Sequence, residues 1–106
     1  MPKYMLEINY PAEGIKAVLE KGGSAREAAA REVVASVGGS LESFYFAFGG
    51  TDAYAVADLP DNAAAAAIAL TVTGGGGPHI STVVLLTPAE IDAASQQQVR
   101  YDPPGS

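Results

Sequence analysis

The first residues of the chain alternate between apolar and polar side chains, which is the pattern of a half-buried β-strand. Over residues 3–10, the sequence K-Y-M-L-E-I-N-Y places large apolar side chains at Tyr4, Leu6, Ile8 and Tyr10. Short apolar and aromatic runs predict three more strands, over residues 40–48, 53–59 and 79–86. Helices are predicted over residues 12–20, 25–37 and 62–72, and from residue 88 to about residue 97.

Helix starts in this chain are marked by side chains that can accept hydrogen bonds from free backbone N–H groups. Ser24 and Glu27 have the spacing of a capping box, in which each side chain satisfies a backbone N–H of the first turn. Thr87 and Glu90 repeat this spacing, and Asp61 is placed to cap the alanine-rich helix that follows it. These signals fix where three of the predicted helices should begin.

The predicted order of elements is β-α-β-β-α-β followed by a terminal helix. This is the split-βαβ or ferredoxin-like arrangement, an α+β fold in which an antiparallel sheet carries its helices on one face. No linker and no internal repeat divides the 106 residues. We therefore predict a single domain over residues 1–106.

The second face of this predicted sheet also carries apolar side chains. Strict alternation along the second strand places Phe44, Phe46 and Phe48 together, on the face opposite Leu41. Burying three phenylalanines would remove on the order of 450 Å² from water, at about 150 Å² each, and such a patch rivals the largest on a typical monomer. We therefore expect a homodimer in which two sheets pack face to face into a closed or nearly closed barrel. The alternative is that the terminal helix and the tail fold back over this face.

Composition narrows the partners and the chemistry. The net charge is −6 and the pI about 4.5, which argues against nucleic acid or an anionic membrane surface as a partner. With no cysteine and one histidine, we expect no disulfide, no thiolate chemistry, no metal site and no cofactor. No apolar run approaches the roughly 20 residues that span a bilayer, and the first residues do not resemble a signal peptide. We expect a cytoplasmic protein.

His79 is the natural candidate for proton transfer, because histidine ordinarily changes charge near neutral pH. It follows a Gly-Pro loop at the start of the fourth strand, where it would face the mouth of a barrel or lie exposed at the loop edge. Glu7 and Asn9 lie on the polar side of the first strand. Inside a dimer barrel they would be a carboxylate and an amide in an apolar pocket, with Glu7 as a second acid or base. The alternative is that this side of the first strand is partly exposed to solvent.

The candidate ligand-binding residues are Asn9, Phe44, Phe46, Phe48, Asp52 and Tyr54. The phenylalanines would line an apolar cavity, and Tyr54 could offer its hydroxyl to a ligand or pack with that hydroxyl satisfied. Asp52 stands in the turn after the second strand, where it would bind its own backbone or contact a ligand. Glu27 and Arg31 are spaced for a solvated ion pair on one helix.

Several ordered motifs are shared with a known family. They are M-P-K-Y at the start, G-G-S-x-R-x-x-A at residues 22–29, F-Y-F-A-F-G-G-T-D at 44–52, D-L-P-D-N at 58–62, L-L-T-P-x-E at 85–90 and the closing Y-x-P-P-G. Together they resemble the GYD-domain family of small bacterial proteins. The resemblance implies a ferredoxin-like fold of the dimeric α+β barrel kind and no particular activity. The Gly-Tyr-Asp turn of the family reads Gly50-Thr51-Asp52 here, and the nearby Tyr54 could supply the missing ring.

Three functions are compatible with these features. The leading one is a small dimeric protein that binds an apolar or aromatic metabolite between its two sheets. The second is a cofactor-independent enzyme of the oxygenase or isomerase type, with His79 or Glu7 as acid or base. The third is a structural or assembly module whose barrel is filled by side chains.

Overall fold

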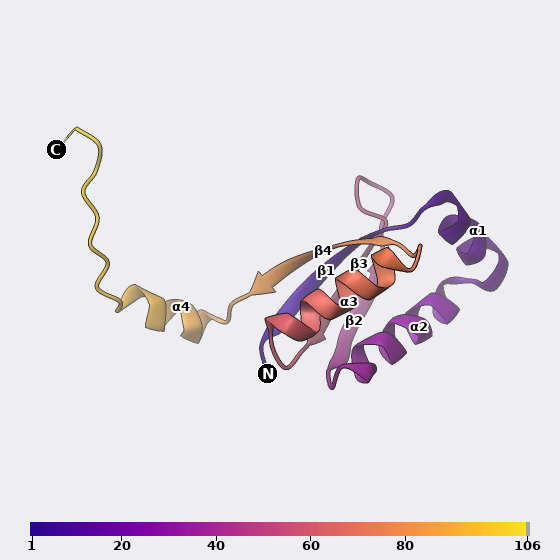
Figure 1. Ribbon diagram of the computed structural model, residues 1–106, viewed down its shortest axis with the longest axis horizontal. Helices are drawn as coiled ribbons and strands as arrows, with labels where there is room; N and C mark the ends of the chain where they lie inside the picture. Colours follow the sequence, from indigo (N-terminus) through magenta and orange to yellow (C-terminus); the bar gives the residue numbers. More distant parts are fainter. Residues whose placement is uncertain (106) are drawn as a thin grey trace.

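A four-stranded antiparallel sheet forms the centre of the computed structural model, which describes residues 1–105 (Figure 1). The strands are β1 (Lys3–Asn9), β2 (Ser40–Phe46), β3 (Ala53–Asp58) and β4 (His79–Leu85). The helices are α1 (Ala12–Lys21), α2 (Gly23–Ser36), α3 (Asn62–Gly74) and α4 (Pro88–Ser95). The strand order is β2-β3-β1-β4 with antiparallel neighbours throughout, which confirms the predicted α+β, ferredoxin-like fold.

One face of the sheet is buried beneath α2 and α3 (Figure 1). β1 buries Tyr4, Leu6 and Ile8, as its alternation predicted. The buried tyrosine keeps its hydroxyl satisfied, since Tyr4 Oη donates a 2.5 Å hydrogen bond to Asn62 Oδ1 at the start of α3. The complete core consists of Tyr4, Leu6, Ile8, Val34, Leu41, Ala53, Ala55, Ala57, Leu59, Ala65 and Ile68.

A β-bulge in β2 changes which side chains reach this core. Leu41 pairs with Ala57, but the next pair is Ser43 with Val56, so Glu42 is an extra residue on β2. Because one inserted residue reverses the alternation, the side chains after the bulge change faces.

The bulge shows that the predicted faces of β2 were wrong. Phe44 and Phe46 lie opposite Ala55 and Ala53, on the same side as the buried Leu41. Phe44 packs against the core under the helices, and Phe48 lies beyond the end of the strand and is fully exposed. The three phenylalanines therefore do not form a patch on the sheet face away from the helices.

Two of the three predicted helix starts are confirmed. Asp61 accepts a 2.9 Å hydrogen bond from the backbone N–H of Ala64, and Thr87 and Glu90 form a complete capping box. The prediction for Ser24 was wrong, because α1 runs on to Lys21 and α2 begins immediately after Gly22. Ser24 is consequently inside the first turn of α2 and cannot cap it.

The C-terminal part of the chain extends away from the sheet and its helices (Figure 1). The radius of gyration is 17.0 Å, compared with about 13 Å expected for a compact domain of this length. Every residue from 86 to 105 is exposed, so neither α4 nor the tail covers the sheet face away from the helices. Among residues 1–105, no helix has the length and apolar character needed to cross a bilayer.

Candidate functional site

A groove of about 590 Å³ lies where α1 and the start of α2 meet the connection between β2 and β3. We call it the aromatic groove; its lining residues are Tyr10, Ile15, Val18, Leu19, Gly23, Phe46, Ala47, Phe48, Gly49 and Asp52. Three of the residues predicted from the sequence to bind a ligand, Phe46, Phe48 and Asp52, therefore come together here. Ile15, Val18 and Leu19 of α1 complete the wall and were not predicted.

The aromatic groove is mostly apolar and openly exposed. Phe48 is 108 % exposed and Leu19 is 81 % exposed, although both are large apolar side chains. Single exposed apolar residues are common on protein surfaces, but several around one concavity are typical of a binding site. The only charged side chain in the lining is that of Asp52.

Contacts between rings shape the inner wall of the aromatic groove. Phe46 packs edge to face against Phe44, with ring centroids 5.2 Å apart, and stacks on Tyr10 at 6.5 Å. Arg26 of α2 lies over the Tyr10 ring at 5.6 Å from its centroid, in a cation–π contact. The wall is thus a continuous series of packed groups that extends from the core to the groove.

Gly23 allows Phe46 to approach the start of α2. A Cβ at this position would lie 2.9 Å from Cε2 of the Phe46 ring, closer than carbon atoms can pack. Any larger residue would therefore displace the ring from the wall of the aromatic groove. The Gly-Gly pair at residues 22–23 was visible in the sequence as a break between helices, but its contact with Phe46 was not.

Asp52 joins the β2–β3 turn to the end of β1. Its Oδ2 accepts a 2.9 Å hydrogen bond from the backbone N–H of Tyr10, and its own backbone N–H donates to the Ile8 carbonyl at 3.0 Å. The backbone N–H of Ala47 donates to the Asp52 carbonyl oxygen at 2.9 Å. The carboxylate therefore binds the backbone of a neighbouring segment. The prediction that it would bind the backbone of its own turn was wrong.

A second group of predicted residues lies on the opposite side of the sheet. We call this side the open face; it carries Lys3, Met5, Glu7, Asn9, Ser40, Ser43, Tyr45, Tyr54, Val56, Asp58, His79, Ser81, Val83 and Leu85. None of these side chains is buried within the chain. The helices lie on the other side of the sheet, and the C-terminal segment extends away from it (Figure 1).

Strand pairing arranges the open face in rows across the sheet. Glu7 lies opposite Tyr54 on one side and Ser81 on the other, and Asn9 lies opposite His79. The sheet thus brings together the two alternative candidates for acid or base, Glu7 and His79, and two predicted ligand contacts, Asn9 and Tyr54. Tyr54 is absent from the residues lining the aromatic groove. Tyr54, which the sequence offers in place of the missing aromatic ring of the turn, lies on the open face, whereas Asp52 lines the aromatic groove.

Ion pairs lie at the end of the open face where β1 begins. Lys3 Nζ lies 2.8 Å from Glu42 Oε2 and 3.0 Å from Asp58 Oδ1. The hydrogen bonds that the Lys3 ammonium donates to Glu42 and to Asp58 raise its pKa above the ordinary value of 10.5. Within residues 1–105, no three His, Asp or Glu side chains gather in a way that could hold a metal ion.

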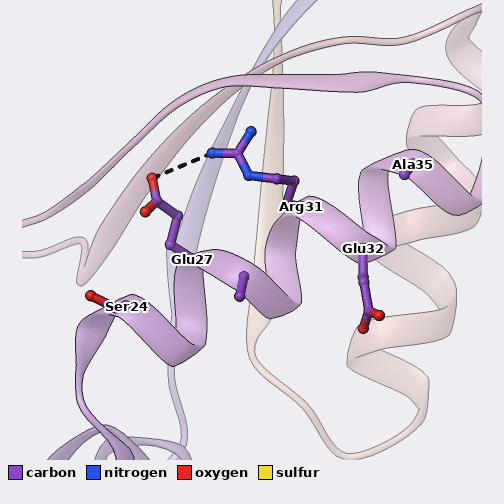
Figure 2. A pocket seen from close by; sticks show the side chains of 6 residues that line it. Ser24, Glu27, Arg31, Glu32 and Ala35 are labelled. Carbon is purple, nitrogen blue, oxygen red and sulfur yellow. Dashed lines mark ion pairs between the residues drawn. The ribbon is translucent and has the colours of Figure 1, made fainter.

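The outer surface of α2 has a shallow hollow of about 300 Å³ that we do not assign as a site. In Figure 2, the side chains of Glu27 and Arg31 point toward each other, and their closest charged atoms are 3.6 Å apart. This confirms the predicted ion pair, and Arg31 also donates a 3.3 Å hydrogen bond to the Leu41 carbonyl. Glu27 and Arg31 thus satisfy each other on a solvated helix face.

Comparisons with known proteins identify the family of this chain and no individual relative. Neither the curated proteins nor the solved structures gave a match to this chain. A family model described as GYD domain matches residues 4–95, which run from β1 to the end of α4. The chain therefore belongs to the GYD-domain family.

Proposed function

We propose that this protein binds a small apolar or aromatic molecule in the aromatic groove and works as a homodimer. The observation that carries the proposal is the groove itself: about 590 Å³ of space walled by Phe46, Phe48 and the apolar side of α1. That volume is within the range of about 300–1,000 Å³ in which small-molecule sites occur. The sequence predicted a ligand between two sheets. The proposed site lies instead on the helix side of one sheet, because Phe44 and Phe46 are on that side.

The lining also limits the ligand chemically. Asp52 is the only charged residue in the wall, and a carboxylate has room to accept a further hydrogen bond beside the one from Tyr10. A neutral or cationic ligand with one donor group fits this wall, whereas an anion would meet the Asp52 carboxylate in a chain of net charge −6. Ring stacking on Phe46 and Phe48 would favour a flat ligand.

Uncovered apolar side chains support the homodimer. On the open face, Met5 lies between Val56 and Val83, and residues 1–105 place no helix or loop over this apolar row. Antiparallel sheets with one wet face normally alternate apolar and polar residues, so an apolar row on the exposed face favours a partner sheet. In a dimer with two-fold symmetry, the open faces of the two copies would pack against each other and bury this row in both copies.

The binding test uses Nile red, an uncharged aromatic dye whose fluorescence rises in apolar sites. We expect saturable binding by the wild-type chain and a loss of at least about tenfold in affinity in Phe48→Ala, since about 1.4 kcal/mol of the ring's burial energy would be removed. Leu70→Ala is the matched control, because Leu70 is also exposed, at 75 %, but lies on α3. Equal binding by Phe48→Ala and wild type would exclude the groove as the site.

Acid–base catalysis on the open face is a second candidate function. Its support is the placement of Glu7 between Tyr54 and Ser81, with His79 in the next row. In a homodimer this polar end would be enclosed by a second copy, and His79 and Glu7 would then share a water-poor cavity. The test is the turnover of any molecule recovered with the protein. A normal rate in both His79→Ala and Glu7→Gln would exclude this function.

A further inference from the structure

We infer that residues 86–105 form an arm that packs on the second copy of this chain. The inference rests on the proposed homodimer and adds a contact to it that the sheet faces alone do not supply. Four large apolar side chains of the arm are at least half exposed: Leu86 at 55 %, Ile91 at 51 %, Val99 at 80 % and Tyr101 at 73 %. Nothing else in the described chain covers them, since all of residues 86–105 are exposed.

The helix in the arm is too short to be stable alone. α4 has 8 residues, whereas isolated helices shorter than about 12–15 residues are marginal in water. The capping box of Thr87 and Glu90 fixes where α4 begins, but caps contribute only about 0.5–2 kcal/mol. α4 therefore needs a surface to pack on, and the family match, which extends to residue 95, includes α4.

The solvent-exposed area of the chain is larger than that of a compact monomer, as expected if a partner covers part of it. The chain exposes 7100 Å², about 1,600 Å² more than the roughly 5,500 Å² expected for a compact monomer of 10.8 kDa. A standard protein interface takes only about 800 Å² from each partner. The excess surface of this chain is therefore sufficient for a stable interface that includes the arm as well as part of the open face.

The direction of the arm favours a second molecule over the chain's own sheet. β4 is an edge strand, and its end at Leu85 lies beside Lys3, at one end of the sheet. The chain continues outward from there (Figure 1), with Thr87 extended and Pro88 next, so it makes no reversal toward its own open face.

The position and length of the arm favour a second copy as the occupant. Val83 and Leu85 belong to the open face, so the arm begins at the border of the proposed sheet-to-sheet interface. The ten residues 96–105 can span up to about 35 Å, longer than the roughly 23 Å of a seven-residue strand. An arm of this reach can cross the sheet of the partner.

The arm is tested by spin labelling, which is simple because the chain has no cysteine. Gln97→Cys carries a nitroxide on unlabelled protein, which is exchanged with ¹⁵N-labelled wild type while native mass spectrometry records the oligomeric state. We expect broadened amide signals in the ¹⁵N-labelled copy, and no such broadening from a nitroxide at Glu32→Cys, on the helix side of the molecule. A reduced nitroxide gives the reference spectrum.

The outcomes separate the arm from the homodimer. Broadening between copies from position 97 supports the arm. A dimer in which position 97 leaves the signals of the ¹⁵N-labelled copy unbroadened overturns the arm and leaves the sheet-to-sheet dimer standing. A monomer overturns both. As a second readout, we expect Ile91→Asp to raise the dimer dissociation constant at least tenfold and Leu70→Asp to leave it unchanged; equal constants for the two variants would overturn the arm.

Discussion

The carboxylate of Asp52 accepts a 2.9 Å hydrogen bond from the backbone N–H of Tyr10, although the two residues are 42 positions apart. This bond ties the β2–β3 turn to the chain where it leaves β1 and enters α1. It thereby holds two walls of the aromatic groove together, the turn with Phe48 on one side and Tyr10 on the other. The position of the groove depends on a contact that joins distant parts of the sequence.

We expect Asp52→Ala to lower the free energy of unfolding by about 1.5–3 kcal/mol, the range for hydrogen bonds to charged groups. The same variant should weaken Nile red binding, because the turn is released from Tyr10. Urea unfolding monitored by circular dichroism and dye titration measure the two effects. Asp52→Asn keeps an acceptor oxygen and should lie between the wild type and Asp52→Ala; unchanged stability in Asp52→Ala would contradict the structural role.

Gly23→Ala should affect the aromatic groove more than stability. The new Cβ would meet the Phe46 ring, which is 41 % exposed and can move outward, so the cost in unfolding free energy should stay within about 1 kcal/mol. Nile red affinity should fall several-fold because the ring leaves the wall. Gly74→Ala is the control, since a Cβ there meets nothing within 4 Å and Gly74 lies at the end of α3, outside the lining of the groove. Equal dye affinities in the two variants would disprove the close contact.

Deletion of Glu42 should be tolerated by the sheet. Without the bulge residue, Leu41, Phe44 and Phe46 fall on one face by strict alternation and keep their partners Ala57, Ala55 and Ala53 on β3. We expect the deletion to cost only about 0–1 kcal/mol of unfolding free energy, because it removes an exposed ion pair with Lys3. The control Glu42→Ser removes the same ion pair and keeps the bulge, so the two variants should unfold alike in urea. Loss of cooperative unfolding in the deletion variant alone would contradict this account of the bulge.

The ion pairs of Lys3 predict a pH effect in the alkaline range. Because the folded-state pKa of Lys3 is raised above 10.5, its stabilising contribution is fully present below that pH and is lost as the pH rises through the folded-state value. The stability difference between wild type and Lys3→Met should therefore shrink above about pH 10.5 and also shrink in high salt. Lys16→Met, at an exposed position on α1, is the control. A difference that stays constant between pH 9 and 11.5 would contradict this assignment.

Much of the fold could be predicted from local patterns. Alternation assigned the buried face of β1 correctly, because this strand pairs with both of its neighbours without interruption. It failed in β2, where Glu42 inserts one residue and only the pairing with β3 reveals it. Asp61 and Thr87 marked helix starts by chemistry that acts within one turn, whereas Ser24 failed because α1 extends to Lys21 and leaves only Gly22 between the helices.

The candidate site was less predictable than the fold. Phe46, Phe48 and Asp52 were found from the sequence, but their neighbours Leu19 and Tyr10 were not. The apolar residues of α1 look like a core-facing stripe in the sequence, and only the displacement of α1 from the sheet leaves Leu19 exposed. A groove between distant segments depends on tertiary packing, which periodicity along one segment does not report.

Native mass spectrometry of the protein purified from cells tests the central claim most directly. The account predicts a dimer that carries an added mass of a few hundred daltons per occupied groove, and a dimer without that mass in the Phe48→Ala variant. A monomer would contradict the homodimer, and an added mass retained in Phe48→Ala would contradict the aromatic groove as the binding site.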